Sequence, residues 1–375
     1  MTMQKKIPLF TPRIPRDIDL SIGKTLSSGY IAQGALVDEF ERRLGDFVEN
    51  KRVCAVSDIS GAITLALYNA GIRPGDHVVL SPMVCLATSS PIANLFAQPV
   101  WCDVDPDTGM PSVENIRDAI TPATKAIIFS HWSGDVGAIE EIYGLAKSRG
   151  IALIEDASEA FGAMLNKRPL NASYADYTAY SFGPVRQITC GEGAALLTHS
   201  EREHDQLRRT RRYGIDQQSF RLDTGDLNPA SDISLAGFNF PFNNIGATLG
   251  IRQLAEAADV LKKYRSNGEY FEGALRGIAG VRQLIRRANC QSGYWTFSFR
   301  AERREKLVQK LTASGVSCQR LHLRNDLYTC FSRGTTVDDL PGVDVFDREN
   351  LSIPCGWWLR EEDLHRVSSC ILDGW

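Results

Sequence analysis

The sequence predicts an α/β fold, with a mostly parallel seven-stranded sheet sandwiched by helices and a smaller C-terminal α+β domain. Seven short apolar runs rich in β-branched residues occur between residues 53 and 197, and amphipathic segments separate several of them. Continuously apolar strands that alternate with helices are typical of a parallel sheet covered on both faces. The 375 residues suffice for two domains, which we expect at 1–255, with an N-terminal arm, and at 256–375.

The expected elements follow from these patterns. The apolar runs predict strands at residues 53–56, 78–80, 99–104, 126–130, 152–154, 178–182 and 194–197. Helical periodicity predicts helices at 62–70, 113–120, 139–149 and 201–212. In the C-terminal part we expect a long helix over 244–270, a strand over 294–300, and helices over 302–314 and 361–371. The polar stretch 223–232 contains Gly and Pro and predicts a surface loop.

Composition excludes several classes of protein. The 42 Lys and Arg nearly balance the 45 Asp and Glu, so no basic excess points to nucleic acid or to an anionic membrane. Residues 1–10 lack the apolar core of a signal peptide, and no stretch approaches the ~20 apolar residues of a spanning helix. The nine cysteines include no C-x-x-C pair, which argues against a disulfide framework or a zinc ribbon. Reduced thiols indicate a cytoplasmic protein.

The candidate site lies at the carboxyl ends of the strands, where ligands bind in such sheets. The loops concerned are 57–61, 81–88, 130–134, 155–161 and 181–193. Asp156 follows a predicted strand and has two interpretations: it holds a protonated ring nitrogen, or it caps a helix. Ser60 lies in a turn before a helix, where free amides form an anion cup, although many helices begin in the same way. Ser181 begins a loop whose Gly191-x-Gly193 permits close backbone approach.

Two further patterns are weaker. Asp103, Asp105 and Asp107 imitate the start of a calcium loop, but the sixth position requires glycine and is Thr108, so we expect no metal site. His131 and His322 are candidate general bases, with a structural role as the alternative for each.

Taken in order, the motifs resemble those of the DegT/DnrJ/EryC1/StrS family of sugar aminotransferases over nearly the whole chain. The matching segments are SGYIAQG at 28–34, GIRPGD at 71–76, VDPDT at 104–108, IEDA at 154–157, YSF at 180–182, GEG at 191–193, GFNF at 237–240, LSIP at 351–354 and EEDL at 361–364. The resemblance implies the aspartate-aminotransferase fold (fold type I) and a pyridoxal-phosphate enzyme.

The resemblance also implies site residues. The family's partner of the pyridinium nitrogen falls on Asp156. Its phosphate ligands fall on the turn of Ser60 and Gly61, on Ser181 and, from a neighbouring subunit, on Asn239. It therefore implies a homodimer with shared sites.

The departures from the family are as informative. The lysine that forms the Schiff base with the cofactor corresponds to Arg186. A guanidinium stays protonated below about pH 12 and is a poor nucleophile and a poor base, so Arg186 does not replace that lysine. The aromatic residue that stacks on the cofactor ring corresponds to Leu86, and the family's glutamine corresponds to Glu159. Several changes in the loops of one pocket indicate repurposing.

We therefore favour a biosynthetic enzyme repurposed away from lysine-dependent transamination. Its substrate would be a small molecule: a sugar, an amino sugar or a related natural-product intermediate, with a nucleotide-linked sugar or an amino-acid derivative as candidates. Arg186 would bind an anion, while His131, Asp156, Glu159 and Cys85 would transfer protons. No covalently bound cofactor is expected.

Three alternatives remain open at this point. One is a keto-sugar dehydratase that holds pyridoxal phosphate (PLP) or pyridoxamine phosphate (PMP) without a covalent bond. Another is an aminotransferase that uses Lys167 or Lys24, neither of which aligns with the family's lysine. The third is a non-catalytic homologue that binds a ligand or regulates a partner.

Overall fold

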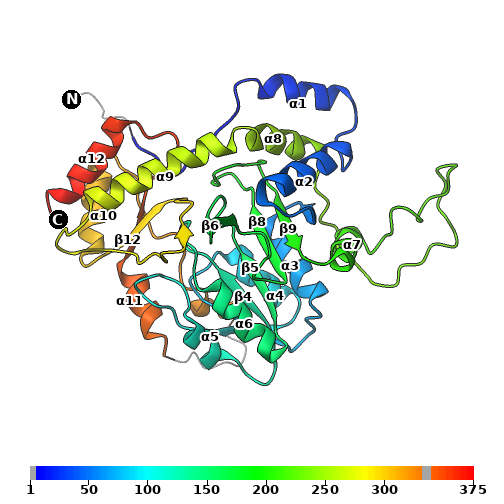
Figure 1. Ribbon diagram of the computed structural model, residues 1–375, viewed down its shortest axis with the longest axis horizontal. Coiled ribbons are helices and arrows are strands. Elements are labelled where there is room, and N and C mark those ends of the chain that lie inside the picture. The colour runs from blue at the N-terminus through cyan, green and yellow to red at the C-terminus, as the bar shows by residue number, and fades with distance from the viewer. Residues whose placement is uncertain (1–5, 332–338) are drawn as a thin grey trace.

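The computed structural model describes residues 6–331 and 339–375 and contains the predicted seven-stranded sheet (Figure 1). The strands lie in the order β1-β9-β8-β5-β4-β2-β3. Strand β9 is antiparallel to both of its neighbours, while the other pairs are parallel, so the mostly parallel sheet is confirmed. The bounds are β1 (Val53–Val56), β2 (His77–Leu80), β3 (Gln98–Trp101), β4 (Thr124–Ser130), β5 (Ala152–Asp156), β8 (Tyr177–Ser181) and β9 (Ala194–Thr198).

Helices cover both faces of the sheet, each over its own apolar cluster. On one face pack α3 (Ile59–Asn69), α4 (Leu86–Asn94) and α7 (Glu201–Thr210), and on the other α2 (Ala35–Val48), α5 (Val113–Ala119) and α6 (Ile139–Arg149). The four helices predicted in this region are confirmed. Three others were not predicted: α1 (Ile18–Ser27), α2 and α4, the last of which contains Pro91, a residue that disfavours a helix interior.

The expected long helix over 244–270 is wrong in one respect, because it is broken into α8 (Asn244–Leu254) and α9 (Ala257–Ala274). Arg13 of the N-terminal segment meets the break, where its guanidinium pairs with Glu256 and its carbonyl accepts a hydrogen bond from Gln253. Beyond α9 a third apolar cluster forms from Ile7 and residues between 260 and 371. The division at residues 255 and 256 stays a prediction.

The C-terminal elements surround this third cluster. A three-stranded antiparallel sheet has the order β10-β12-β13, and a second small sheet has the order β11-β6-β7. The bounds are β6 (Met164–Leu165), β7 (Arg168–Pro169), β10 (Val281–Gln283), β11 (Cys290–Gln291), β12 (Phe297–Ala301), β13 (Asn350–Ile353), α10 (Arg304–Ala313), η1 (Asn325–Leu327), η2 (Thr329–Phe331), α11 (Pro341–Glu349) and α12 (Glu361–Leu372).

The predicted surface loop at 223–232 is confirmed, since it contains neither helix nor strand and its residues are mostly exposed. It belongs to the long green excursion that follows α7 and extends away from the body of the molecule (Figure 1). Within residues 6–331 and 339–375, no helix combines the length and hydropathy required to cross a lipid bilayer.

A buried ion pair links α2 to the end of α7. The Nη1 of Arg211 donates to Oε1 of Glu41 over 2.7 Å and to the carbonyl of Ala55 over 2.6 Å. The same Glu41 oxygen accepts the Ala55 amide over 2.8 Å, and Arg211 is fully buried. The two charges thus pair with each other and with strand β1 through Nη1, while the buried Nε of Arg211 has no acceptor among the described residues.

Candidate active site

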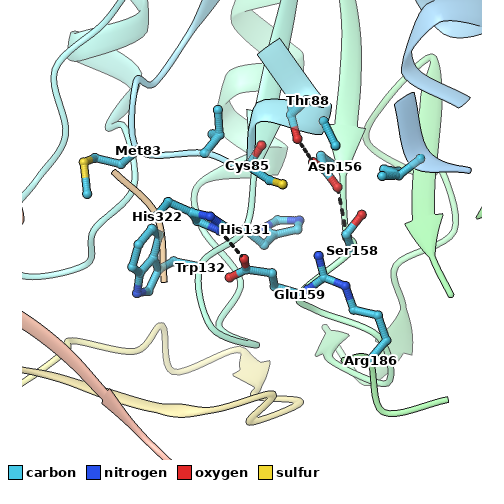
Figure 2. Close-up of a pocket in the computed structure, with 14 residues that line it drawn as sticks. Met83, Cys85, Thr88, His131, Trp132, Asp156, Ser158, Glu159, Arg186 and His322 are labelled. Atoms are coloured by element: carbon cyan, nitrogen blue, oxygen red, sulfur yellow. Dashed lines mark hydrogen bonds and ion pairs between the residues drawn. The ribbon is translucent and has the colours of Figure 1, made fainter. Parts of the chain in front are cut away.

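A cleft opens at the carboxyl ends of β2, β4, β5 and β8, as the fold class predicts (Figure 2). The space between its walls amounts to about 370 Å³ when the solvent at its open mouth is included. The described residues that line it are Ile59, Met83, Val84, Cys85, Ala87, Thr88, Ser130, His131, Trp132, Asp156, Ser158, Glu159, Arg186 and His322. The predicted residues Arg186, His131, Asp156 and Glu159 therefore meet in one cleft.

Asp156 ends β5, and its buried carboxylate is held from two sides. Thr88 of α4 donates its hydroxyl to Oδ2 over 2.7 Å, and the Ser158 amide donates to Oδ1 over 3.1 Å (Figure 2). A carboxylate accepts about four hydrogen bonds, so Asp156 retains capacity for a donor in the cleft. The arrangement suits a fixed anion that holds a protonated ring nitrogen.

Glu159 forms an ion-pair geometry with His322, whose Nε2 lies 2.6 Å from Oε1 (Figure 2). The other carboxylate oxygen accepts the Ser133 amide over 2.7 Å. Burial by itself raises the pKa of Glu159, but the neighbouring His322, the Arg186 cation and the Ser133 amide outweigh it and lower the pKa below its usual range. Glu159 is thus a carboxylate at neutral pH.

His131 does not fit the proton-transfer role predicted for it. Its side chain is buried, and its Nδ1 accepts the Gly137 amide over 3.3 Å. The proton therefore resides on Nε2, which lies 2.9 Å from Oε1 of Glu155 and donates to it. With both ring nitrogens taken up inside the protein, His131 has none left for a ligand.

Arg186 lies on an aromatic platform at the side of the cleft. Its guanidinium carbon is 4.3 Å from the centre of the Trp295 ring, a cation–π contact. Trp295 stacks on Phe10 with the ring centres 4.9 Å apart, and its Nε1 donates to the Val185 carbonyl over 2.7 Å. The buried Nη1 of Arg186 has no hydrogen-bond acceptor among the described residues. The guanidinium thus lies against the indole ring with its buried Nη1 available as a donor.

The residues that the resemblance assigns to the cofactor lie near the cleft but do not line it. Ser60 and Gly61 are in the first turn of α3, where the Gly61 amide donates to Oδ1 of the capping Asp58 over 2.8 Å. Ser181 ends β8 and its hydroxyl accepts the Gly183 amide over 3.3 Å. Asn239 is exposed beside the end of α7.

The structure also turns Leu86 away from the cleft. It is the first residue of α4 and is 44% exposed, while its neighbours Cys85 and Ala87 line the wall. The side chains of successive residues at the start of a helix point in different directions, so the side chains of Cys85, Leu86 and Ala87 cannot all face the cleft. Burial raises the pKa of the Cys85 thiol, which opposes its ionisation at neutral pH.

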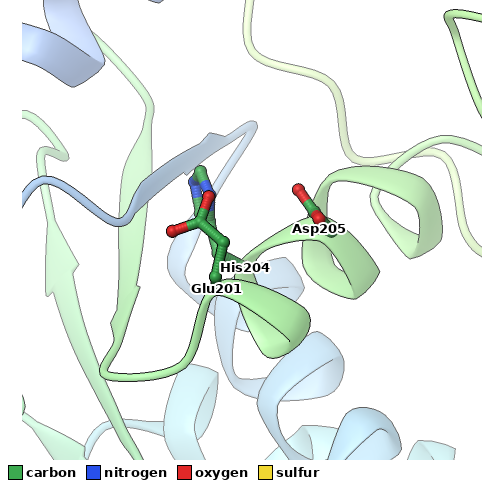
Figure 3. A group of neighbouring side chains, drawn as sticks. All are labelled: Glu201, His204 and Asp205. Carbon is green, nitrogen blue, oxygen red and sulfur yellow. The ribbon is translucent and has the colours of Figure 1, made fainter.

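The described residues hold one cluster with metal-ligand chemistry, formed by Glu201, His204 and Asp205 on α7 (Figure 3). Two of its three groups are already engaged, because Nε2 of His204 lies 3.0 Å from the Val53 carbonyl and Glu201 pairs with Arg52 over 3.0 Å. It therefore gives no support for a metal centre.

Sequence reasoning missed Trp295 and undervalued His322. Both come from the C-terminal part of the chain, more than a hundred residues after Arg186, and no local motif marks either of them. One signal in the sequence did point to a partner for His131. Glu155 follows three apolar residues in a buried strand, and a buried carboxylate requires a hydrogen-bonding partner.

Comparison with known proteins identifies the family. The sequence profile of the DegT/DnrJ/EryC1/StrS aminotransferase family matches residues 12–372, nearly the whole chain. The chain belongs to this family. Among curated proteins, the spore coat polysaccharide biosynthesis protein SpsC of Bacillus subtilis (strain 168) is 28% identical over 275 residues, which are 73% of this chain and 70% of that protein.

Two solved structures have the same fold over the whole chain or nearly so. The sugar aminotransferase CalS13 from Micromonospora echinospora superimposes with a TM-score of 0.92 at 30% identity and covers 98% of this chain and 100% of its own. AtS13 from Actinomadura melliaura gives a TM-score of 0.93 at 29% identity, with both chains covered completely. The predicted fold type and the membership of an enzyme family are therefore confirmed.

The cleft fits the family's pyridoxal cofactor in part. The spare acceptor capacity of the buried Asp156 carboxylate suits a protonated ring nitrogen, and the first amides of α3 suit a phosphate. No lysine is among the described residues that line the cleft. The described residues of the cleft thus offer partners for the ring nitrogen and for the phosphate, but no lysine amine.

Proposed function

We propose that this protein is a biosynthetic enzyme on the sugar aminotransferase fold that no longer carries out lysine-dependent transamination. Its substrate is a sugar, an amino sugar or a related intermediate that bears a negative charge, and Arg186 binds that charge. One observation carries the proposal: at the cleft wall a fixed guanidinium has a buried donor without an acceptor, and no lysine lies beside it.

Arg186 provides binding rather than nucleophilic attack. A buried donor without an acceptor destabilises the protein by about 1–3 kcal/mol, and by more when the group is charged. An anion that accepts a hydrogen bond from Nη1 removes this destabilisation, which favours binding. A carboxylate or a phosphate accepts two parallel bonds from one guanidinium. The Trp295 platform limits the rotation of the guanidinium and so reduces the entropy lost when the anion binds.

Asp156 supports a second candidate within the same family, a dehydratase-like enzyme that uses PLP or PMP without a covalent bond. Asp156 would hold the ring nitrogen, while the amides of Ile59 and Ser60 and the Ser181 hydroxyl would hold the phosphate. When bound, such a cofactor supplies a ring that withdraws electrons from the reacting carbon. Glu159, an ionised carboxylate, would lie in the same cleft and accept donors of the substrate.

A homodimer completes the proposal. Asn239 is exposed and does not line the cleft of its own chain. In a dimer, it would contribute to the cleft of the second copy. Sedimentation of the purified protein should give a mass of two chains, and Asn239→Ala should leave that mass unchanged while weakening phosphate-bearing ligands. A monomer with full activity contradicts this part of the proposal.

Mass spectrometry tests the central proposal directly. The wild-type protein is incubated with pyridoxal phosphate, reduced with borohydride and digested. We expect no cofactor-modified lysine in the cleft, whereas Arg186→Lys provides the positive control for the method. A stoichiometric adduct on a lysine of the wild-type protein overturns the proposal and restores ordinary transamination.

Thermal unfolding with three sugars tests the anion site. Glucuronate carries a carboxylate, glucose 6-phosphate carries a phosphate, and glucose has the same ring without charge. We expect stabilisation by one or both anions and none by glucose, and we expect Arg186→Gln to abolish the difference. Equal responses of the wild-type and variant proteins contradict an anion site at Arg186.

A further inference from the structure

Two histidine–carboxylate pairs lie at the cleft, and they differ in what they leave free. In the His131–Glu155 pair both ring nitrogens have partners within the protein, and Glu155 also accepts the Thr178 hydroxyl. In the His322–Glu159 pair only Nε2 of the ring is engaged, and no described residue hydrogen-bonds to Nδ1. His322 therefore has a ring nitrogen available to a ligand, whereas His131 has none.

The carboxylate of Glu159 determines which ring nitrogen of neutral His322 carries the proton and which carries the lone pair. An ionised carboxylate only accepts hydrogen bonds, so a neutral imidazole must donate Nε2–H to it across the 2.6 Å contact. The lone pair then resides on Nδ1. A histidine base oriented by a carboxylate on its other nitrogen is a proven arrangement for proton transfer.

We propose that His322 is the residue of this cleft that takes up and returns protons, through Nδ1, and that Glu159 is its positioning residue. The inference rests on the proposed function only in that both require a substrate in the same cleft. Of the two histidines that the sequence offers as candidate general bases, it selects His322, from the C-terminal part of the chain, over His131.

The segment that carries His322 is fixed to the cleft wall. Asn325, three residues further on, is 1% exposed, and its amide donates to the Pro82 carbonyl over 3.0 Å. Its side chain donates to the Val84 carbonyl over 3.0 Å and to the Ser89 hydroxyl over 2.9 Å. Three hydrogen bonds therefore tie the histidine segment to α4 and to the loop that leads into it.

The ring itself is also held in orientation. Trp132 packs edge-on against His322 with the ring centres 5.6 Å apart, and the Ser133 amide holds the far oxygen of Glu159. Rotation of either member of the pair would break a buried contact. The imidazole is thus presented to a ligand in one orientation, as proton transfer requires.

The proposed step balances without a further reactant. A proton leaves a C–H, N–H or O–H bond of the ligand for the Nδ1 lone pair, and the electron pair of that bond stays on the ligand. The imidazolium that forms is stabilised by the Glu159 carboxylate, and the Arg186 cation in the same cleft favours the negative charge on the ligand. The proton then returns to another atom of the ligand or to water.

Nitrogen-15 NMR of histidine-labelled protein reads the position of the proton directly. We expect neutral His322 to carry its proton on Nε2, with the resonance assigned by its loss in His322→Asn. In Glu159→Gln the amide can either donate or accept, so we expect the Nε2–H form to lose its dominance. A dominant Nδ1–H form in the wild-type protein, or an unchanged balance in Glu159→Gln, overturns the inference.

Acylation by diethyl pyrocarbonate tests the second requirement, a lone pair that a reagent can reach. The reagent attacks unprotonated ring nitrogens, and peptide mass spectrometry resolves each histidine. We expect acylation of His322 while His131 remains unmodified, which makes His131 the matched internal control. Protection of His322, or modification of His131 at the same rate, contradicts the assignment. Neither measurement involves a lysine adduct, so failure here is separate from failure of the proposed function.

Discussion

The guanidinium of Arg186 and the indole of Trp295 are 4.3 Å apart, so the cation of the cleft is held by an aromatic ring from the C-terminal part of the chain. A second link runs from the indole Nε1 to the carbonyl of Val185, the residue next to Arg186. The backbone and the side chain at this position are therefore both oriented by one residue. Since Trp295 also stacks on Phe10, three remote segments of the chain meet at the cation.

This relationship predicts a graded response to substitution of Trp295. Trp295→Phe keeps an aromatic face but removes the bond to Val185, and we expect a loss of about 1 kcal/mol in the free energy of unfolding. Trp295→Leu removes the face as well and should also abolish the stabilisation by anionic sugars. Trp357 is the matched control, because it lies away from the cleft. Its Nε1 also donates to a backbone carbonyl, that of Thr11, with a length of 3.0 Å. If Trp357→Leu weakens anion binding as strongly as Trp295→Leu, the platform has no specific role.

A lysine at position 186 should not by itself create an efficient aminotransferase. Arg186→Lys supplies an amine, but Leu86 points outward, so the cofactor ring gains no stacked aromatic residue, a contact worth about 1 kcal/mol. We expect a weak absorbance of bound pyridoxal phosphate and little turnover of amino donors. Turnover equal to that of an ordinary family member would mean that the other departures in the cleft have no consequence.

The buried pair of Arg211 and Glu41 should make a large contribution to stability. Loss of one partner leaves an uncompensated buried charge, so we expect Glu41→Met or Arg211→Met to lower the free energy of unfolding by about 3–5 kcal/mol. The double variant Glu41→Met with Arg211→Met should lose less than the sum of the two single changes, because no charge remains unpaired. Arg52→Met, at an exposed pair with Glu201, should cost less than about 1 kcal/mol. Urea unfolding of the four variants measures these differences, and equal losses for buried and exposed pairs contradict the argument.

The sequence predicts the sheet and its loops well because their signals are local. Apolar runs such as the one before Asp156 mark each strand, and the fold class then brings the strand ends together. Asp156, Glu159 and Arg186 were found in this way, each in a loop at a strand end.

What the sequence does not predict depends on contacts between distant segments. His322 and Trp295 reach the cleft only because the C-terminal part packs against the sheet, and the Asn325 bonds that position His322 join residues more than two hundred positions apart. The orientation of Leu86 is set by which side of the first turn of α4 faces the cleft. The two hydrogen-bond partners of His131, Glu155 and Gly137, also become visible only in three dimensions.

The lowered pKa of Glu159 predicts how its contribution to stability changes with pH. A carboxyl group whose pKa is lower in the folded than in the unfolded protein stabilises the fold above the unfolded value, here 4.5, and loses that contribution as the pH falls through the folded value. The excess stability of the wild-type protein over Glu159→Gln should therefore shrink as the pH is lowered from 6 to 3, by about 1.4 kcal/mol for each unit by which the pKa is lowered. His322→Asn removes the partner that contributes most to the lowering, so the same comparison made in that background should show a smaller change with pH. Chemical denaturation at closely spaced pH values measures both differences, and a wild-type excess that is constant or grows toward low pH contradicts an ionised, His322-paired Glu159.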